Sequence, residues 1–258
     1  MSRRLASVFA HPDDDTFGVT GVVALGVNDR EFRFTSVLVT SGEHGMISDP
    51  ALATAETLGA VREREDRAAW RTLGREPDRL EFLRYADGAV PEAPMDELVG
   101  RIAEVLREER PDVVVTFGPD GITAHPDHIR VGEATTAAFH AVRAEGGDGL
   151  RRLLFVCLPR TELEWFSDEL VKRGMDPIDQ TQMFQPRGVP DDTISIRVDC
   201  SSVWRSKHAA LLEHRTQAAD MQFPGDLVET MFSAEFFVQV WPGREPGAPV
   251  LGDVFEGL

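Results

Sequence analysis

The chain has 258 residues, of which 42% are hydrophobic and 28% are charged, as in ordinary globular proteins. Its formal net charge of −17 would repel nucleic-acid backbones and anionic membrane surfaces, so we expect neither as a partner. No apolar run is long enough for a transmembrane helix, and the apolar stretch at the amino terminus is too short for a signal peptide. The two cysteines provide neither a disulfide framework nor a metal-ligand spacing. We therefore expect a cytoplasmic protein without membrane insertion.

Apolar patterns alternate along the chain between those of strands and those of helices. In chain order they predict a strand over 4–10, a helix over 17–29, a strand over 31–40, a helix over 50–73, a strand over 80–83, a helix over 95–109, a strand over 112–117, a helix from 126 to about 144, a strand over 151–158, a last strand over 193–199 and a helix over 201–219. The helix over 95–109 has the clearest pattern, with apolar residues at steps of three and four and Pro111 after its end. This alternation indicates parallel βαβ units.

The expected architecture is therefore an α/β protein with a mostly parallel, Rossmann-like sheet. We expect one domain over 1–258, because no repeat or low-complexity tract divides the chain. The span 174–192 is rich in proline, glycine and aspartate and is expected to form a long loop. The segment 242–258 begins with closely spaced prolines and glycines and is expected to be a surface tail.

Two motifs rich in imidazole and carboxylate groups follow two of the predicted strands. The motif AHPDDD occupies 10–15, after the strand over 4–10, and HPDH occupies 125–128, soon after the strand over 112–117. In an open α/β sheet, the loops at the carboxyl ends of the strands bind ligands. We expect the two motifs to meet at this edge of the sheet.

The spacing within the motifs is that of a metal site. His11 and Asp14 are three residues apart, as are His125 and His128, so each pair can face one point from a turn or a helix. Two histidines and one carboxylate form a set that catalytic zinc uses, with water in the open position. The same set is the facial triad of non-haem iron oxygenases, so Zn²⁺, Fe²⁺ and other divalent metals stay open. Taken alone, each motif could instead be a helix cap or a solvated acidic turn.

The combined motifs resemble the PIG-L/LmbE-like family of zinc-dependent de-N-acetylases, which includes N-acetylglucosaminyl deacetylases of the mycothiol, bacillithiol and GPI type. The family signature is AHPDDE near the amino terminus and a later HPDH. Four further stretches resemble family motifs, namely 40–43, 62–74, 110–116 and 207–217. The resemblance implies an LmbE-like three-layer sandwich, a Zn²⁺ cofactor and hydrolysis of the N-acetyl group of a small N-acetylglucosaminyl conjugate.

The resemblance also implies roles for individual residues. The implied metal ligands are His11, Asp14 and His128. Asp13 would be the general base, and His125, oriented by Asp127, would stabilise or protonate the tetrahedral intermediate. Arg62, Glu43 and Asp87 would bind the sugar hydroxyls, although Arg62 could also be an exposed helical ion pair. This agrees with general chemistry, because Zn²⁺ can lower the pKa of bound water to about 7 and a carboxylate can then take its proton.

Two positions depart from the family pattern. Asp15 stands where glutamate is usual, so whatever that carboxylate contacts behind the metal ligands is expected to be rearranged. Thr123 stands where some members have a tyrosine that helps to bind the developing oxyanion. The only tyrosine of the chain, Tyr85, belongs to a different predicted loop. Lys207 and Gln217 are expected to have structural roles.

Other functions fit parts of the pattern. An amidase that removes a larger acyl group from an amino-sugar thiol conjugate would use the same residues. An iron oxygenase would use the same triad, but those proteins are usually all-β, so the predicted βαβ pattern counts against it. A nucleotide-binding module would need the motif G-x-G-x-x-G after the first strand, and the chain lacks it there. A metal-binding protein without catalysis is a further alternative. The loops at 44–55 and 174–192 would bind the aglycone, and they carry no motif that identifies it. A homo-oligomer stays open, and the candidates for its core or its interface are Phe184, Phe232, Phe236 and Phe237.

Overall fold

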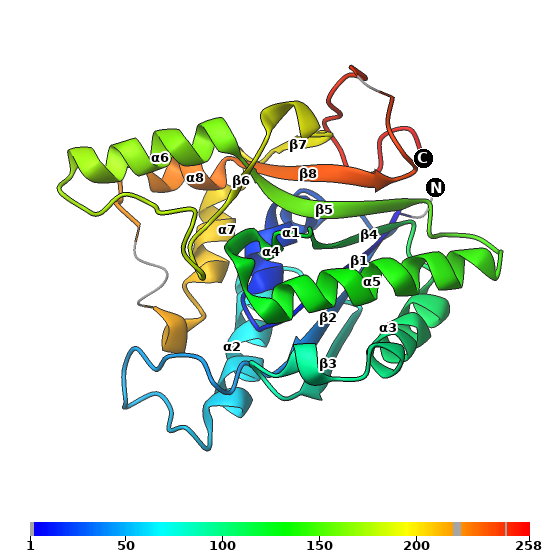
Figure 1. Ribbon diagram of the computed structural model, residues 1–258, viewed down its shortest axis with the longest axis horizontal. Helices are drawn as coiled ribbons and strands as arrows, with labels where there is room; N and C mark the ends of the chain where they lie inside the picture. The colour runs from blue at the N-terminus through cyan, green and yellow to red at the C-terminus, as the bar shows by residue number, and fades with distance from the viewer. Residues whose placement is uncertain (1–2, 219–222, 246) are drawn as a thin grey trace.

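The computed structural model describes residues 3–218, 223–245 and 247–258, and a mostly parallel sheet lies at its centre (Figure 1). The strands are β1 (Arg3–Phe9), β2 (Phe32–Thr40), β3 (Arg79–Tyr85), β4 (Val113–Phe117), β5 (Arg152–Pro159), β6 (Gly188–Val189), β7 (Ile196–Asp199) and β8 (Ala234–Trp241). Their order is β3-β2-β1-β4-β5-β8-β7, with β6 beside the end of β5. The first five strands are parallel, whereas β8 is antiparallel to β5 and to β7.

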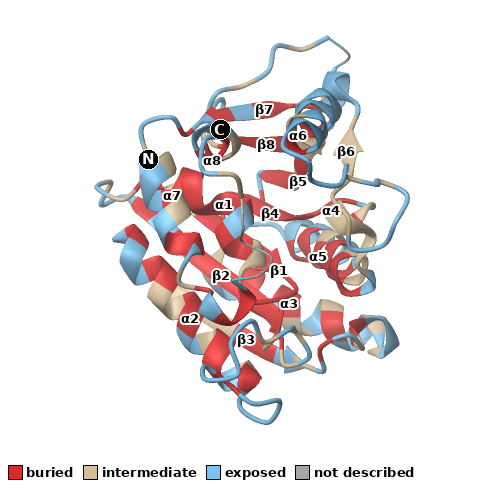
Figure 2. Cartoon of the chain, turned by 90° about the vertical axis from the view of Figure 1, so that its left-hand side faces the viewer, coloured by how far each residue is buried: buried red, intermediate tan, exposed pale blue. Residues whose placement is uncertain are grey.

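Helices cover both faces of the sheet. They are α1 (Asp14–Leu25), α2 (Leu58–Leu73), α3 (Met95–Glu109), α4 (Gly121–Ala124), α5 (Pro126–Ala144), α6 (Arg160–Lys172), α7 (Trp204–Leu211) and α8 (Val228–Phe232), with 3-10 turns η1 (Val90–Glu92), η2 (Asp191–Thr193) and η3 (Arg215–Gln217). Helices α1, α2 and α7 pack together on one face, and α3 and α5 pack on the other (Figure 2). Among the described residues, no helix combines the length and hydropathy that a membrane crossing requires. The result is the predicted three-layer α/β arrangement.

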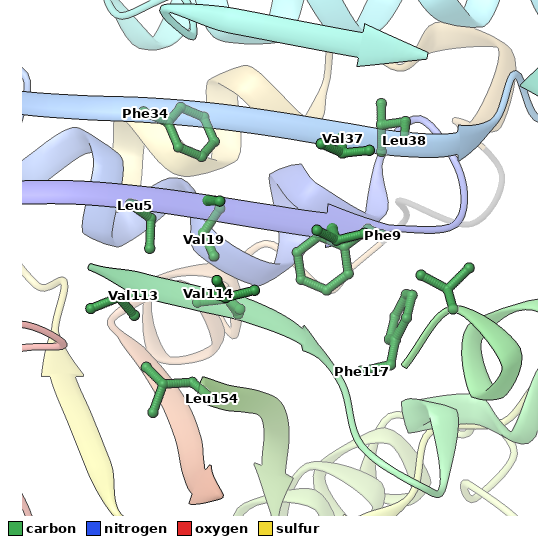
Figure 3. Packing of buried hydrophobic residues seen from close by; sticks show 14 of the residues in the cluster. Leu5, Phe9, Val19, Phe34, Val37, Leu38, Val113, Val114, Phe117 and Leu154 are labelled. Carbon is green, nitrogen blue, oxygen red and sulfur yellow. The ribbon is translucent and has the colours of Figure 1, made fainter. Parts of the chain in front are cut away.

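The central strands are apolar on both faces because helices cover both faces. All five residues of β4 are buried, and Leu5 and Phe9 of β1 are at most 1% exposed. Figure 3 shows Leu5, Phe9, Val113, Val114 and Phe117 packed with their neighbours from β2 and α1. A side chain at Gly132 of α5 would lie 2.5 Å from the Phe117 carbonyl oxygen, so glycine lets α5 approach the end of β4 closely. This contact positions the second motif, which opens α5.

Several predicted elements are confirmed, and others are wrong in ways that have physical causes. Helix α3 spans the predicted 95–109, and α5 ends at the predicted residue 144. The strand over 193–199 is not the last one, because β8 follows it and inserts between β5 and β7. Helix α6 was not predicted, and only two of its residues, Leu163 and Leu170, are buried.

The remaining differences concern helix ends. The helix expected over 17–29 is shifted to α1, and the helix expected over 50–73 begins only at Leu58. The helix expected over 201–219 is divided into α7 and η3, and residue 219 lies outside the described residues.

The surface tail expected over 242–258 is wrong from Leu251 on, whereas Pro249 and Val250 before it are exposed as expected. Leu251 pairs with Ile196 of β7, and Val254 is completely buried in the main core. Arg152, at the start of β5, donates a hydrogen bond of 2.6 Å to the Val254 carbonyl oxygen. The segment therefore returns to the sheet, which its proline and glycine content did not indicate.

A buried ion pair joins α7 and β8 to α1. Lys207 Nζ lies 3.0 Å from Glu235 Oε1, and each side chain is only 4% exposed. The Glu235 carboxylate also accepts hydrogen bonds from the backbone N–H groups of Gly21 and Val22 in α1. A side chain at Gly21 would clash with Cys200 Sγ and with Glu235, so this approach requires glycine. Lys207 thus has the structural role that was expected of it.

We predict that Glu235→Ala lowers the free energy of unfolding by about 3–5 kcal/mol, because it leaves the Lys207 ammonium buried without a carboxylate. The double variant Lys207→Met/Glu235→Leu should lose much less, since neither charge remains. Urea denaturation measures both, with the exposed Glu145→Ala as a control that should stay close to the parent. If Glu235→Ala is no less stable than Glu145→Ala, the assigned role of this ion pair is wrong.

His214 is a second buried polar contact between the late part of the chain and α1. Its Nε2 lies 3.0 Å from Thr16 Oγ1, and the residue is 1% exposed. Burial, together with the nearby Arg62 guanidinium, lowers the pKa of His214 to about 3. The imidazole is therefore neutral in the folded protein at neutral pH.

Because the folded-state pKa of His214 lies below its unfolded value of about 6.5, its contribution to stability is complete above that pH and is lost as the pH falls toward 3. We predict a loss of about 2 kcal/mol from this group between pH 7.5 and pH 5. In His214→Gln the free energy of unfolding should decline less steeply over that interval, whereas the exposed His140→Gln should follow the parent. Equal slopes in the parent and His214→Gln would contradict the assignment.

Candidate active site

The two motifs meet because the strands that lead into them are neighbours. Strands β1 and β4 are parallel and in contact, with Leu5 opposite Val113, so both end at the same edge of the sheet. The first motif follows β1 directly, and the short helix α4 connects β4 to the second motif. As a result, His11 Nδ1 lies 3.1 Å from His128 Nε2, although the two residues are 117 positions apart.

Three side-chain atoms from the two motifs form a small triangle. His11 Nδ1 lies 3.2 Å from Asp14 Oδ2, His128 Nε2 lies 3.4 Å from the same oxygen, and the two nitrogens are 3.1 Å apart. Around a tetrahedral Zn²⁺ with bonds of about 2.0–2.1 Å, ligand atoms lie about 3.3–3.4 Å from each other. The triangle therefore fits one face of a tetrahedral ion, and the fourth position would be open to water.

Hydrogen bonds turn both histidine lone pairs toward this triangle. His128 Nδ1 lies 3.0 Å from the Gly121 carbonyl oxygen, which can only accept, so Nδ1 carries the hydrogen and Nε2 is free. His11 Nε2 lies 3.0 Å from Asp87 Oδ1 and 3.3 Å from Asp127 Oδ2, which leaves its Nδ1 free. Carboxylates that hold the second nitrogen of a ligand histidine are typical of metal sites.

Two other groupings of potential ligand atoms overlap the triangle. His125 offers a nitrogen within 4.8 Å of those of His11 and His128, and the carboxylates of Asp87 and Asp127 are equally close to His11. The two carboxylates contact the opposite nitrogen of His11, so they are placed to orient it rather than to share an ion with its Nδ1. In the triangle with Asp14, all three distances between the ligand atoms are 3.4 Å or less.

The electrostatics of the site favour a positive charge at His11. Burial opposes it, but the carboxylates of Asp127, Asp14 and Asp87 raise the pKa of His11 well above its ordinary value. Burial lowers the pKa of His128 to about 4, so His128 is neutral. The pKa of Asp14 is far below its ordinary value because His128 and His11 outweigh its burial. His128 and Asp14 are therefore in the forms that bind a metal, a neutral imidazole and an ionised carboxylate, whereas His11 would exchange its Nδ1 proton for a metal ion bound there.

Asp13 lies on the same turn, in a backbone conformation that is rare for a non-glycine residue, with φ 124°. Strained residues of this kind cluster at functional sites. Arg62 Nη2 donates hydrogen bonds to Asp13 Oδ2 at 3.0 Å and to the Pro12 carbonyl oxygen at 2.8 Å. Burial raises the pKa of the Asp13 carboxyl to about 7, with Arg62 acting in the opposite direction. A carboxyl group with a pKa near neutrality suits a general base.

The three residues expected to bind the sugar all have partners within the protein. Arg62 is only 4% exposed and also donates to the Gly42 carbonyl oxygen, so the alternative of an exposed ion pair is wrong. Asp87 contacts His11 and accepts a hydrogen bond from the His44 backbone N–H. Glu43 accepts one from the backbone N–H of Asp87. These contacts favour roles in positioning the site.

His125 lies at the outer end of a column of rings. Phe117 stacks on His128 at 4.1 Å between centroids, and His128 stacks on His125 at 4.7 Å. His125 Nδ1 accepts a hydrogen bond from the Asp127 backbone N–H, which leaves Nε2 as the protonated nitrogen. Asp127 therefore orients His125 through its backbone, while its carboxylate accepts from the backbone N–H of Gly88 and contacts His11.

The structure explains the first departure from the family pattern. Asp15 accepts hydrogen bonds from Ser36 Oγ and Trp70 Nε1, and a second buried carboxyl group, Asp66 of α2, lies beside it. Burial raises the pKa of Asp15 to about 6 and that of Asp66 well above its ordinary value, so Asp66 is protonated and can share a hydrogen bond with Asp15. Asp66 was not predicted, although charged residues within the apolar stripe of a helix are a signal that could have found it.

The second departure, Thr123, contacts the loop after α6 through its backbone. The Thr123 carbonyl oxygen accepts a hydrogen bond from the backbone N–H of Phe184, which brings the loop after α6 next to His125. Tyr85 is elsewhere, with its hydroxyl group donating to Glu97. Gln217 donates to the Met46 carbonyl oxygen and so holds the loop after β2, in line with its expected structural role.

Comparison with known proteins gives relatives over nearly the whole chain. The family model described as PIG-L: GlcNAc-PI de-N-acetylase matches residues 6–139, which include both motifs. A 1D-myo-inositol 2-acetamido-2-deoxy-alpha-D-glucopyranoside deacetylase from Salinispora arenicola is 30% identical over 99% of this chain and 92% of its own. The N,N'-diacetylchitobiose deacetylase of Pyrococcus horikoshii has a similar structure, with a TM-score of 0.59, 23% identity and coverage of 95% of this chain and 84% of its own.

The fold also occurs in a protein with a different reaction. The 4-carboxy-2-hydroxymuconate hydratase GalB of Pseudomonas putida has a TM-score of 0.61 at 18% identity, covering 95% of this chain and 98% of its own. At such identities the likeness concerns the fold, which does not select the reaction. The match of family motifs and the relatives in sequence nevertheless establish the lineage: the chain belongs to the PIG-L family and has its LmbE-like three-layer α/β fold.

Proposed function

We propose that this protein is a metal-dependent hydrolase, with Zn²⁺ as its metal, that removes the N-acetyl group from a small N-acetylglucosaminyl-type substrate in the cytoplasm. The observation that carries the proposal is the triangle of His11, Asp14 and His128 beside Asp13, whose carboxyl pKa is raised to about 7. The names of the sequence relatives, which are amino-sugar deacetylases, support the substrate class.

The residues around the triangle can perform each step of amide hydrolysis. A divalent ion supplies Lewis-acid polarisation and water of lowered pKa when it is bound. Asp13 accepts the proton of the attacking water at its carboxylate, in the position that Arg62 fixes. His125 presents its Nε2–H to stabilise the developing negative charge or to pass a proton to the departing amine. The products are acetate and the free amino sugar.

Several groups act only by positioning these residues. Asp87 and Asp127 fix the ring of His11, and the Gly121 carbonyl fixes that of His128. The loop after β2 holds Asp87 in turn, through the backbone of His44 and the side chain of Glu43. We propose that these groups support the metal ligands. Their loss would weaken metal binding more than it would weaken substrate binding.

We predict that Asp13→Asn lowers kcat by about 10²–10⁴-fold while zinc content stays at the parent level, because the variant loses the proton acceptor but no proposed ligand. Acetate release from 1D-myo-inositol 2-acetamido-2-deoxy-alpha-D-glucopyranoside and from N-acetylglucosamine, with Zn²⁺ added, measures this. The exposed Asp168→Asn is the matched control and should keep the parent rate.

Two results would contradict parts of the proposal separately. If Asp13→Asn binds zinc and keeps the parent rate, Asp13 is not the base. If the zinc-loaded parent releases no acetate from any N-acetylglucosaminide but cleaves a longer N-acyl group, the enzyme is the amidase considered above, and comparison of kcat/KM for the two acyl groups decides between them.

A further inference from the structure

The segment between α6 and β6 is fastened to the turn that precedes His125. The backbone N–H of Phe184 donates to the Thr123 carbonyl oxygen at 2.8 Å, and that of Arg187 donates to the Ile122 carbonyl oxygen at 2.7 Å. In Figure 1 this segment, drawn in yellow-green, runs past α4. Part of the predicted loop over 174–192 is therefore held at the edge of the active site by two backbone hydrogen bonds.

Phe184 extends the column of rings at that edge. Its ring lies edge-on to His125, with 5.1 Å between the centroids, and the residue is 60% exposed. The exposed ring therefore presents an apolar surface, which we call the Phe184 platform, beside the residue proposed to act on the amide.

The backbone is strained both at Phe184 and in the turn of α4 to which it is hydrogen-bonded. Phe184 has φ 67°, and Ile122 and Ala124 of α4 have φ 62° and φ 57°. A positive φ is a genuine outlier for a bulky residue, and such conformations persist only where the surrounding structure enforces them, most often at ligand sites. Single exposed apolar residues are common on protein surfaces. Phe184 differs from them because its backbone is strained and is hydrogen-bonded to Thr123 beside the active site.

The platform contrasts with the rest of the site. Carboxylates and imidazoles of the two motifs form and flank the triangle, and they suit a polar amide. If the acetamido group reacts at Asp13 and His125, the part of the substrate beyond the sugar must cross the rim of the site, and Phe184 belongs to that rim. A polar aglycone such as inositol would gain little from this apolar ring, whereas a flat apolar group would bury it.

We infer that the substrate of this protein carries an aglycone with an apolar face, an aryl group being its simplest form, which packs on Phe184. This inference rests on the proposed function, because it takes the amide to react beside His125. It makes Phe184 a specificity-determining residue, and it separates the substrate of this chain from the inositol glycoside that names its relatives.

The test compares benzyl and methyl 2-acetamido-2-deoxy-alpha-D-glucopyranoside, which share the sugar and the reacting amide. The zinc-loaded parent should favour the benzyl glycoside by about tenfold in kcat/KM, the size of one good aromatic contact. Phe184→Ala should bring the ratio close to one, and Phe184→Leu should keep part of it. Val250→Ala, which removes an exposed apolar side chain from the carboxyl-terminal segment, should keep the parent ratio.

A parent ratio near one, or a ratio that Phe184→Ala leaves intact, overturns the inference while the proposed function stands. If neither glycoside is deacetylated, the proposed function fails, and the inference is then decided by calorimetric binding of the two glycosides to the same proteins. Tighter binding of the benzyl glycoside that depends on Phe184 supports the platform, and equal binding overturns it.

Discussion

Carboxylates buried around His11 are the constraint on which the site depends. The carboxylates of Asp14, Asp87 and Asp127 all lie within 3.3 Å of its ring nitrogens, and each of these side chains is at most 13% exposed. Burying negative charges is costly unless a positive charge lies beside them. His11 provides that charge by a raised pKa, and a divalent ion in contact with its Nδ1 would provide it more completely. The same charges therefore stabilise the arrangement and select a cation.

The sheet brings these charges together, and the loops after its strands keep them in place. Strand β1 leads to the first motif and β4 leads through α4 to the second, while the loop after β3 carries Asp87 and the loop after β2 supplies its partners. Arg62 reaches the same point from α2 and ties Asp13 to the Gly42 carbonyl oxygen. Since the proposed ligands come from loops on adjacent strands, their positions depend on the register of the sheet more than on any one loop.

Local pattern was enough to predict much of this arrangement. The spacing of His11 and Asp14 and of His125 and His128, placed after apolar runs, predicted that the motifs would meet, and the period of 95–109 predicted α3. Residues whose position depends on distant contacts could not be predicted. Strand β8 pairs with β5, more than 70 residues earlier, and Val254 is buried by the start of β5, and neither contact has a local signature.

The roles of polar side chains were harder to predict than their presence. Arg62, Glu43 and Asp87 were expected at the sugar, but the structure gives each of them a partner within the protein. Only the fold shows which atom each side chain reaches. In the same way, the role of Asp66 is clear only in the structure, where it lies beside Asp15. A buried carboxyl group requires a hydrogen-bond partner, and the sequence does not show which residue that partner is.

Metal binding tests the central claim most directly. Purified protein should take up about one Zn²⁺ per chain, and Asp14→Asn and His128→Gln should each weaken that binding by at least about a hundredfold, whereas the exposed His140→Gln should bind as the parent does. Elemental analysis together with competition against a chelator gives both quantities. Absence of zinc after reconstitution, or equal affinity in the parent and the Asp14 and His128 variants, would contradict the account.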